Sequence, residues 1–458
     1  MATGSDLSLA TLKESGVRFV RLTWVDFGNC VRYKILPLKH FEKLVASARG
    51  GFTVTVAIMG AVFLTVAEGV TVVGEYVWKP DLSTLRLAPY ADGHATVLGN
   101  FTRETANSAG QRESHEIDLC PRGILRRVVE SAKKTAGVDF LVGFETEFVL
   151  LKSTSPVQPV NDHGYSCGTA TASGTTETQA LEEMANAIMD AGIELEMYHS
   201  EAAPGQYEII TGPLPPLEAA DALICTRETI QNVASKHGLR ATFTPLVFDH
   251  SCGTAAHTHV SLKSDRPTSS ANVEDAPDMT ELEASFLQSL LNHLPSVLAF
   301  TMPTPASYSR MVDGIWSGGT YVAWGRDNRE CPVRLCGFNG DWNFEIKTAD
   351  GTSNPHLALS AILSAGMLGV KEGIKLQAKN CLQPPATVTE EQRAAWGVTQ
   401  RLPSTVEQSW ESLKADQALV SELGEHFIER YFALTKIWAE SMTASTPEET
   451  LRLYLENY

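Results

Sequence analysis

The chain has 458 residues, of which 43% are hydrophobic and 20% are charged, a composition typical of globular proteins with a large core. Its length predicts two or three domains. The formal net charge is −17 and no long basic run offsets it, which argues against a nucleic acid or an anionic membrane as a partner.

The cysteines and the apolar runs favour an intracellular protein. Eight cysteines are scattered without a C-x-x-C pair, which predicts reduced thiols rather than a disulfide framework or a zinc site. The first eight residues have no basic segment followed by an apolar one, so we expect no signal peptide. The longest apolar runs, such as residues 54–66, are interrupted and short for a bilayer span. We therefore expect a cytoplasmic location and no membrane partner.

The first predicted elements form a small mixed unit. Hydrophobic patterning predicts strands at residues 17–25, 31–36, 81–87 and 94–98, and a helix at residues 41–48. Residues 101–116 are polar and rich in Ser, Thr, Asn and Gly. This composition predicts a linker, and we place a domain boundary there.

Longer helices and strands alternate in the remainder. Helices are expected at residues 122–135, 177–190, 217–237, 281–291 and 354–369, and over much of 405–456. Strands are expected at residues 140–150, 194–199, 240–248 and 257–262, and the polar stretches 153–174 and 265–278 are predicted loops. Because several neighbouring strands look like hairpins, the pattern favours an α+β fold over a doubly wound parallel sheet.

The most informative segment covers residues 142–148 and reads VGFETEF. As a strand, it places Glu145 and Glu147 on one face and Phe144 and Phe148 on the other. Two carboxylates close together near a core repel each other, and a divalent cation between them is the simplest remedy. Neighbouring carboxylates are also how proteins assemble Mg²⁺ or Mn²⁺ sites. The alternative is a half-exposed strand with solvated glutamates.

Two further segments repeat this theme of acids and histidines. Glu201 and Glu208 flank a Pro-Gly turn, which can direct both carboxylates to one point or can be a solvated loop. His257, His259 and Ser261 share one face of a predicted strand. A single strand histidine is usually structural, whereas a His-x-His pair is more often a set of ligands.

Charged residues also recur near residue 330. Glu345 lies within an apolar strand, and four arginines are close in the sequence: Arg310, Arg326, Arg329 and Arg334. Arginines at this density suit the recognition of phosphate or carboxylate, although a salt-bridged surface is the commoner role of any single arginine. The chain has no G-x-x-x-x-G-K-[ST] loop and no convincing G-x-G-x-x-G after a strand. Any nucleotide must therefore be held by metal ions and arginines.

Five ordered motifs resemble those of the type I glutamine synthetases, and they lie at residues 143–148, 204–208, 257–262, 328–329 and 354–358. The resemblance extends from about residue 17 to residue 373 and is closest to the glutamine-synthetase-like proteins of fungi and the nodulin-related group. It implies an N-terminal β-grasp domain at residues 1–112. A larger catalytic α+β domain would follow at residues 113–458, with the curved antiparallel sheet and helices of glutamine synthetases and guanido kinases. It also implies self-association into stacked rings, with active sites between neighbouring subunits.

The resemblance assigns two groups of metal ligands by motif position. One Mg²⁺ or Mn²⁺ ion would be held by Glu147, Glu201 and Glu208. A second would be held by Glu145, His257 and Glu345. Members of this family bind two or three such ions in each site.

The same motifs imply contacts with ATP and the acid substrate. His259 and Ser261 lie where the family contacts ATP. Arg329 and Arg334 match the catalytic arginines that steady the transferred phosphoryl group, and Arg310 matches the arginine that binds the substrate carboxylate.

Several positions depart from the family pattern. Trp316 occupies the position of the catalytic glutamate, and the Asp-Gly-Ser-Ser loop that deprotonates ammonium has no match in residues 50–70. The Asn-Gly pair that positions glutamate reads Cys252-Gly253, and a second carboxylate-binding arginine reads Lys347. Gly253, Trp316 and Lys347 would therefore line altered substrate sites. An aromatic residue in place of an acid suits an organic amine better than ammonium.

These features predict an ATP-dependent ligase that acts through an acyl phosphate and joins glutamate or a related acid to an organic amine. The first alternative is a catalytically silent relative that serves as a scaffold or developmental regulator. The second alternative, a metal-dependent hydrolase, depends on the His257-Thr258-His259 segment. In amidohydrolase barrels such a pair lies near the start of the chain, whereas here it is central.

Overall fold

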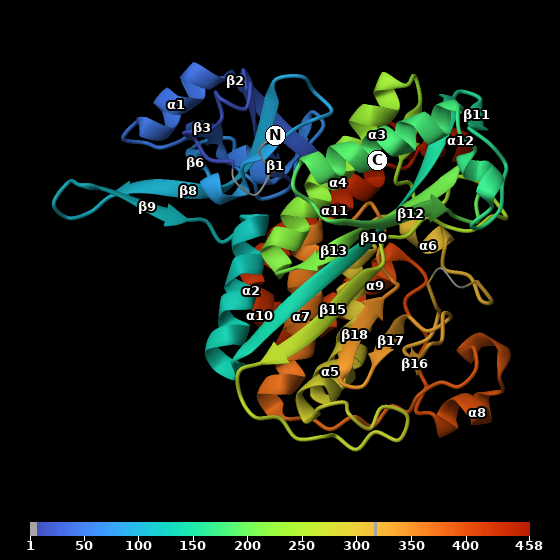
Figure 1. The fold of residues 1–458 in the computed structure, drawn as a ribbon. Coiled ribbons are helices and arrows are strands. Elements are labelled where there is room, and N and C mark those ends of the chain that lie inside the picture. The colour runs from blue at the N-terminus through green and yellow to red at the C-terminus, as the bar shows by residue number, and fades with distance from the viewer. Residues whose placement is uncertain (1–6, 316–317) are drawn as a thin grey trace.

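We describe a computed structural model of the chain, which covers residues 7–315 and 318–458. The N-terminal sheet has the strand order β2-β1-β8-β6-β3, and β7 and β9 pair with β8 (Figure 1). Its strands are β1 (Phe19–Val25), β2 (Val31–Pro37), β3 (Phe52–Thr55), β6 (Glu75–Pro80), β7 (Arg86–Leu87), β8 (His94–Ala106) and β9 (Arg112–Glu116). A short separate hairpin is formed by β4 (Ala61–Val62) and β5 (Thr65–Val66).

The second sheet has nine strands in the order β12-β13-β10-β15-β18-β17-β16, and β11 and β14 also pair with β10. Its strands are β10 (Val138–Thr154), β11 (Val157–Pro159), β12 (Leu195–Ser200), β13 (Gln206–Leu214), β14 (Arg240–Thr242), β15 (Thr258–Ser264), β16 (Trp324–Arg326), β17 (Val333–Phe338) and β18 (Asp341–Ile346). Every pairing is antiparallel except that of β16 with β17. The fold therefore contains a mostly antiparallel sheet rather than a doubly wound parallel one. The predicted α+β class is confirmed.

Helices cover both sheets and extend over the C-terminal third. They are α1 (Leu38–Ala46), α2 (Pro121–Ala136), α3 (Thr176–Asp190), α4 (Pro216–Lys236), α5 (Glu281–Thr301), α6 (Pro305–Ser309), α7 (Pro355–Glu372), α8 (Glu390–Ala395), α9 (Val406–Ala415), α10 (Gln417–Leu423), α11 (Glu425–Ser441) and α12 (Pro447–Asn457). Helix α7 packs against α5 and α2, and α3 packs against α4. No helix in the described part of the chain is both long enough and apolar enough to cross a bilayer.

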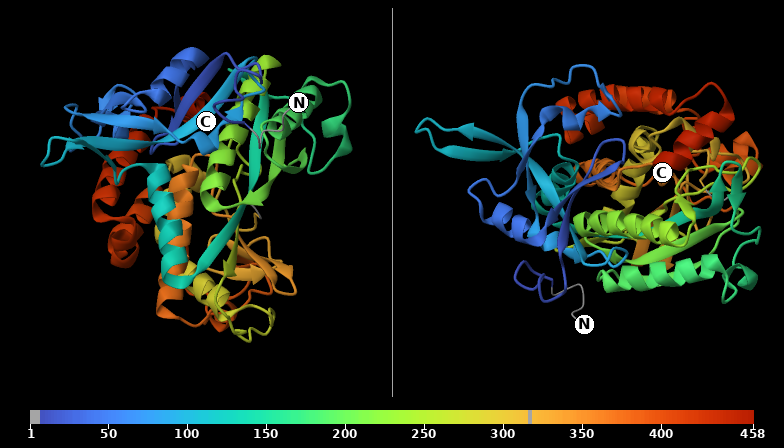
Figure 2. Two further views of the ribbon diagram at one scale, coloured as in Figure 1. Left: turned by 60° about the vertical axis from the view of Figure 1, so that its left-hand side comes forward. Right: turned by 90° about the horizontal axis from the view of Figure 1, so that it is seen from above.

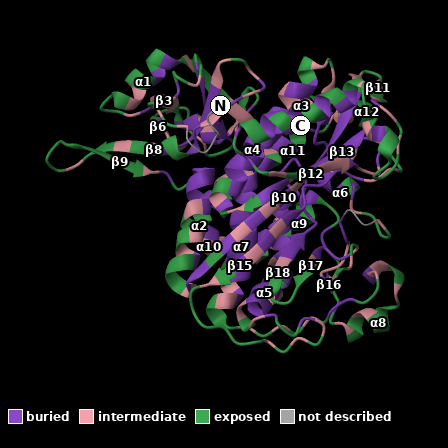
Figure 3. Cartoon of the chain, in the orientation of Figure 1, coloured by how far each residue is buried: buried purple, intermediate pink, exposed green. Residues whose placement is uncertain are grey.

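The long central strand β10 explains how the second sheet separates a core face from a polar face. Phe140, Val142 and Phe144 are buried in the main core together with residues of α5 and α7. Farther along the same face, Phe148 packs with residues of α3 and α4. Figure 3 shows the buried residues concentrated along these strands and helices. Because side chains alternate along a strand, Glu145 and its neighbours two residues away face the opposite side.

A buried ion-pair network connects the N-terminal sheet to the helices. Arg122 of α2 donates two hydrogen bonds to Asp221 of α4, at 2.9 and 2.7 Å. Asp221 also accepts a hydrogen bond of 2.8 Å from His356 of α7, and Arg122 reaches Asp81 at 3.2 Å. The side chains of Arg122 and Asp221 are each only 5% exposed. Such a pair is costly to break because the remaining charge has no access to solvent.

The predicted linker at residues 101–116 is wrong. These residues form the end of β8 and all of β9, a hairpin that projects from the body of the molecule (Figures 1 and 2). Glu104 within it pairs with Lys79 at 3.0 Å and with Arg112 at 2.5 Å. Because the hairpin is solvated on both faces, its polar composition reflected exposure rather than irregular structure. The predicted division at residue 112 stays a prediction and falls at the start of β9.

Two predicted strands are mostly turns. Residues 81–87 contain a 3₁₀ turn, Leu82–Thr84, which Asp81 caps by accepting a hydrogen bond from the Ser83 backbone N–H. The strand predicted at residues 240–248 is limited to β14, because Thr242 Oγ1 accepts a hydrogen bond from the Thr244 N–H and turns the chain. Short polar side chains that bond to nearby backbone compete with strand formation in this way.

Candidate active site

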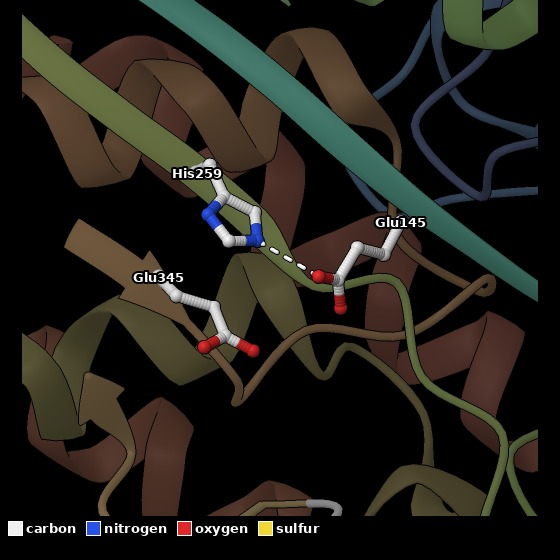
Figure 4. Close-up of side chains that lie close together, drawn as sticks. All are labelled: Glu145, His259 and Glu345. Atoms are coloured by element: carbon white, nitrogen blue, oxygen red, sulfur yellow. Dashed lines mark hydrogen bonds and ion pairs between the residues drawn. The ribbon is translucent and has the colours of Figure 1, made fainter. Parts of the chain in front are cut away.

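Register between strands brings the predicted acids and histidines to one face of the second sheet. Glu147 of β10 lies opposite Glu208 of β13. On the other side, His259 of β15 lies opposite Glu345 of β18. Figure 4 shows the side chains of Glu145, His259 and Glu345 pointing toward one another from three neighbouring strands. The carboxylates that alternate in the sequence thus meet partners from distant segments.

His257 lies at the centre of the first cluster. Its Nδ1 donates a hydrogen bond to Glu145 Oε2 at 2.8 Å and lies 3.3 Å from Glu345 Oε1. His259 donates from both ring nitrogens, to Glu145 Oε1 at 3.1 Å and to Asn343 Oδ1 at 2.8 Å. Burial lowers the pKa of His259, but its bonds with Glu145 outweigh burial and raise that pKa overall. The acceptors around the ring therefore favour the protonated imidazole.

Two basic side chains hold Glu345 within this cluster. Arg334 Nε donates to Glu345 Oε2 at 2.5 Å, and Lys347 Nζ donates to Glu345 Oε1 at 3.1 Å. Lys347 Nζ is also 3.4 Å from His257 Nε2, and only 2% of its side chain is exposed. Although burial raises the pKa of Glu345, the charges of His257 and Lys347 lower it overall. Glu345 is thus an ionised carboxylate inside the protein.

The second cluster contains Glu201, Glu208 and His199. His199 Nε2 lies 3.1 Å from Glu208 Oε1, and its Nδ1 lies 3.6 Å from Glu201 Oε1. The bond with Glu208 raises the pKa of His199 to about 9. Burial, followed by the charges of Glu147 and Glu208, raises the pKa of Glu201 to about 8. Like charges therefore crowd this end of the site.

Glu147 lies between the two clusters and accepts hydrogen bonds from Gln206 and from the backbone of the segment that contains Ala255. Its Oε2 accepts hydrogen bonds from Gln206 Nε2 at 3.0 Å and from the Ala255 backbone N–H at 2.8 Å. Gln206 Nε2 also donates to the Gly253 carbonyl at 3.0 Å. Burial, together with the charge of Glu208, raises the pKa of Glu147, against the effect of His257. Glu147 is 5% exposed.

Three groups of side chains in the described residues have donor atoms close enough to share a metal ion, within 4.8 Å of one another. They are Glu145–His259–Glu345, Glu145–Glu208–His257 and His199–Glu201–Glu208. All six side chains that the resemblance assigned to metals lie in this network, although Glu147 belongs to none of the three groups. The groups also differ from the predicted division, because His259 joins the first and His199 the third.

Beside the first cluster is a cavity of about 450 Å³. Its lining includes Gly143, Glu145, His259, Ser261 and Trp342. His259 and Ser261, which the resemblance assigned to ATP, therefore face the same space as a carboxylate of the cluster. The volume lies within the range of small-molecule sites.

The residues predicted to bind the acid substrate, Gly253 and Arg310, lie beyond Glu147 and are closely packed. A Cβ atom at Gly253 would lie 2.5 Å from Arg310 Cβ, so only glycine fits there. Arg310 Nη2 donates to the carbonyls of Lys347 and Ala349, at 3.1 and 2.9 Å. Its Nε lies 3.7 Å from Asp350 Oδ2. Burial lowers the pKa of Arg310, against the charge of Asp350.

Arg329 is a predicted site residue that is not part of this network. Arg329 is exposed and makes no hydrogen bond or ion pair with any residue that the structure describes. It lies in the turn between β16 and β17, one residue after Asn328, which is anchored to the Cys381 carbonyl at 2.9 Å. Trp316 lies outside the described residues.

Sequence reasoning missed His199 and Asn343. His199 lies two residues before Glu201, near the end of β12, so alternation along the strand could have placed both on one face. Asn343 occupies the strand position two residues before Glu345, and the same signal applies to it. Neither residue was singled out because isolated His and Asn side chains are common in strands without any function.

A family model for the catalytic domain of glutamine synthetase matches residues 118–454, and the chain belongs to the glutamine synthetase family. Gamma-glutamylpolyamine synthetase GlnA3 of Streptomyces coelicolor is 32% identical over 425 residues, which cover 90% of this chain and 88% of that protein. A solved structure described as a novel glutamine synthase homolog has a TM-score of 0.79 and 26% identity. It covers 96% of this chain and 99% of its own.

Another relative is Protein fluG of Emericella nidulans, which is 35% identical over 460 residues. The match covers 97% of this chain but 49% of that protein, so the chain spans about half its length. The family predicted from the ordered motifs is thus confirmed.

Proposed function

We propose that the chain is an ATP-dependent ligase that joins glutamate or a related acid to an organic amine through an acyl phosphate. The observation that carries this proposal is the position of the carboxylate and histidine clusters between a nucleotide-sized cavity and the segment of Gly253 and Arg310. Membership in the glutamine synthetase family supports the same chemistry.

The donor set fits divalent cations. Five buried or half-buried glutamates meet here, and crowding among three of them contributes to the raised pKa of Glu201. Carboxylate oxygens and imidazole nitrogens together suit Mg²⁺ or Mn²⁺. The side chains that would hold the ions are Glu145, Glu147, Glu201, Glu208, His257 and Glu345. When bound, such ions would neutralise charge on a phosphoryl group.

The remaining residues would bind and orient the substrates. His259 and Ser261 would contact ATP along the wall of the cavity, and Arg334 would face the phosphoryl group from its position against Glu345. Arg310 and Gly253 would shape the site of the acid. Arg329, which is exposed in the turn between β16 and β17, would reach the transferred phosphoryl group through a movement of this turn.

An organic amine is favoured over ammonium for two reasons. Tryptophan at position 316 replaces the glutamate that the family resemblance predicts there, and tryptophan cannot accept a proton. A relative that covers most of this chain is named a gamma-glutamylpolyamine synthetase. We therefore infer that an amine with a carbon chain, such as a polyamine, is the second substrate.

The test is release of ADP by the purified chain with Mn²⁺ or Mg²⁺, in a matrix of acids and amines that includes ammonium. Mass spectrometry would identify the amide product. We expect turnover with at least one organic amine and weaker turnover with ammonium. A Glu345→Gln variant should abolish the signal, and an exposed Glu182→Gln variant should leave it intact. Absence of ADP above background across the matrix would refute the proposal.

A silent scaffold is the second candidate, and the position of Lys347 favours it. Its buried ammonium group contacts both Glu345 and His257, so part of the charge that a cation would supply is already present. A cluster stabilised in this way needs less metal to remain folded. Calorimetry that detects ATP binding in the absence of turnover with any acid and amine would favour the scaffold.

Self-association is also proposed, and exposed apolar residues near β4 and β5 support it. Leu64 is 103% exposed, Val72 68% and Val73 78%. Several strongly exposed apolar side chains within one segment of ten residues are a feature of surfaces that contact another molecule. Native mass spectrometry should show an oligomer, and Leu64→Asp with Val73→Asp should shift it toward monomers. A monomeric parent protein would refute this part.

A further inference from the structure

Cys331 and Cys381 form a buried pair of thiols outside the carboxylate clusters. Both residues are 0% exposed, and the interaction between the two thiols contributes to the raised pKa of Cys331. They pack in a small separate core with Ala323 and Val398. The pair joins two segments distant in sequence, the turn between β16 and β17 and the stretch that follows α7.

The first segment carries a residue of the proposed active site. Arg329 lies two residues before Cys331 in this turn. Asn328 Nδ2 donates to the Cys381 carbonyl at 2.9 Å and to the Gln383 carbonyl at 3.1 Å. The Cys381 backbone N–H donates to the Trp324 carbonyl at 3.1 Å. The turn of Arg329 therefore rests directly on the segment of Cys381.

Close packing keeps the two cysteines together. A Cβ atom at Gly325 would lie 3.1 Å from Cys331 Sγ and 3.1 Å from the Cys381 carbonyl oxygen. The site thus leaves no room for a side chain between the two segments. On the outer side, Leu382 is 71% exposed, and residues 374–384 contain neither helix nor strand. Local opening of this coil would expose Cys381 without unfolding of the sheet.

We propose that Cys331 and Cys381 are a redox-sensitive pair whose oxidation to a disulfide holds the turn of Arg329 and slows the ligase reaction. The regulatory part rests on the proposed function, because it requires Arg329 to move during turnover. With both thiols free, the turn is held by hydrogen bonds and by packing. With the disulfide formed, a covalent bond fixes it to the stretch after α7.

Hydrogen peroxide is a sufficient oxidant for this reaction. Peroxide oxidises one thiol to a sulfenic acid and releases one water. The second thiol attacks the sulfenic sulfur, the S–S bond forms and a second water leaves. Two thiols and one peroxide thus give one disulfide and two waters, and a dithiol reductant returns the two electrons by exchange.

The chain contains an internal reference for peroxide exposure. Cys167 is exposed, and hydrogen bonds from Thr169 lower the pKa of its thiol, so it should react first. The hydrogen bond with Cys381, together with burial, raises the pKa of the Cys331 thiol. The pair should therefore oxidise more slowly than Cys167, at a rate set by opening of the coil.

The experiment treats the full chain with hydrogen peroxide and follows two readouts. Peptide mass spectrometry should detect a Cys331–Cys381 disulfide that dithiothreitol removes. ADP release should fall roughly tenfold or more and recover after reduction, since misplacement of a phosphoryl-binding residue has effects of this size. Cys381→Ala and Cys331→Ala should keep activity and lose the response, whereas Cys225→Ala, in a separate core, should retain it.

Each result has a definite meaning. Oxidation of Cys167 without the Cys331–Cys381 link would overturn the proposed pair. Formation of the Cys331–Cys381 disulfide with unchanged ADP release would overturn the proposal that the disulfide regulates the reaction through Arg329. Inactivation by peroxide that persists in Cys381→Ala would overturn it as well. Should the reduced protein release no ADP with any substrate, the proposed function fails, while the mass-spectrometric test of the pair still stands.

Discussion

Substitution of Glu201 by glutamine should have opposite effects on stability without and with metal. In the metal-free protein, burial and then the charges of Glu147 and Glu208 raise the pKa of Glu201 from 4.5 to about 8. A raised carboxyl pKa means that ionisation destabilises the fold. This destabilisation is absent below about pH 4.5 and develops fully as the pH rises through 8.

The size of this destabilisation follows from the shift in the pKa of Glu201. A change from 4.5 to about 8 corresponds to roughly 5 kcal/mol for a fully ionised group. The side chain of Glu201 is 14% exposed, so we discount this value for solvent screening and expect roughly 2 kcal/mol. At pH 8 and without metal, Glu201→Gln should therefore melt roughly 2 to 4 °C above the parent protein.

Addition of Mn²⁺ should reverse the order of the two proteins. A ligand at a hundred times its Kd stabilises the folded state by roughly 2.7 kcal/mol, and the variant lacks one of the proposed ligands. Differential scanning fluorimetry with and without Mn²⁺ at pH 5 and pH 8 measures four melting temperatures for each protein. Glu182→Gln on the exposed face of α3 is the control. A variant that is less stable than the parent without metal, or that gains as much from Mn²⁺, would refute the reasoning.

Three further predictions test the cavity, the cluster and the buried ion pair. Gly143→Leu should fill the cavity and abolish ATP binding measured by calorimetry, whereas Gly143→Ala should bind ATP, because a Cβ there meets no atom closer than 3.9 Å. Lys347→Met removes a buried positive charge beside the proposed metal ligands, so titration should show Mn²⁺ affinity increased roughly tenfold or more. Unchanged affinity would contradict the role of this charge. Asp221→Ala should destabilise the protein by roughly 3 to 5 kcal/mol in denaturant titration because it leaves Arg122 charged and buried. Asp92→Asn, at an ion pair exposed to solvent, should leave the free energy of unfolding without measurable change. Equal effects of Asp221→Ala and Asp92→Asn would refute the argument.

Local pattern was enough to predict the orientation of side chains on β10. Glu145 and Glu147 alternate with Phe144 and Phe148, and the structure places the two phenylalanines in the core. The same pattern does not determine which strand lies beside which. The pairing of Glu147 with Glu208 depends on register between residues that are 61 positions apart, and it became predictable only through the family resemblance.

The wrong predictions of secondary structure have physical causes that a short stretch of sequence does not reveal. Helix α5 was predicted to end at residue 291, yet it continues to Thr301 through Pro295. A proline removes one backbone hydrogen bond, and burial of residues 294–301 in the core compensates for that loss. The hairpin of β8 and β9 was mistaken for a linker because a strand with two solvated faces lacks the alternation that marks a half-buried strand.

The order of residues along β10 also gives a spatial order to the proposed reaction. Glu145 lines the cavity, and Glu147, about 7 Å farther along the strand, is bonded through Gln206 to the Gly253 carbonyl. Gly253 in turn packs against Arg310. A phosphoryl group that passes from a nucleotide in the cavity to an acid beside Arg310 would therefore cross both carboxylates. Two glutamates separated by a single residue would thus connect the two proposed substrate sites, and one strand would supply a ligand to each of the proposed cations.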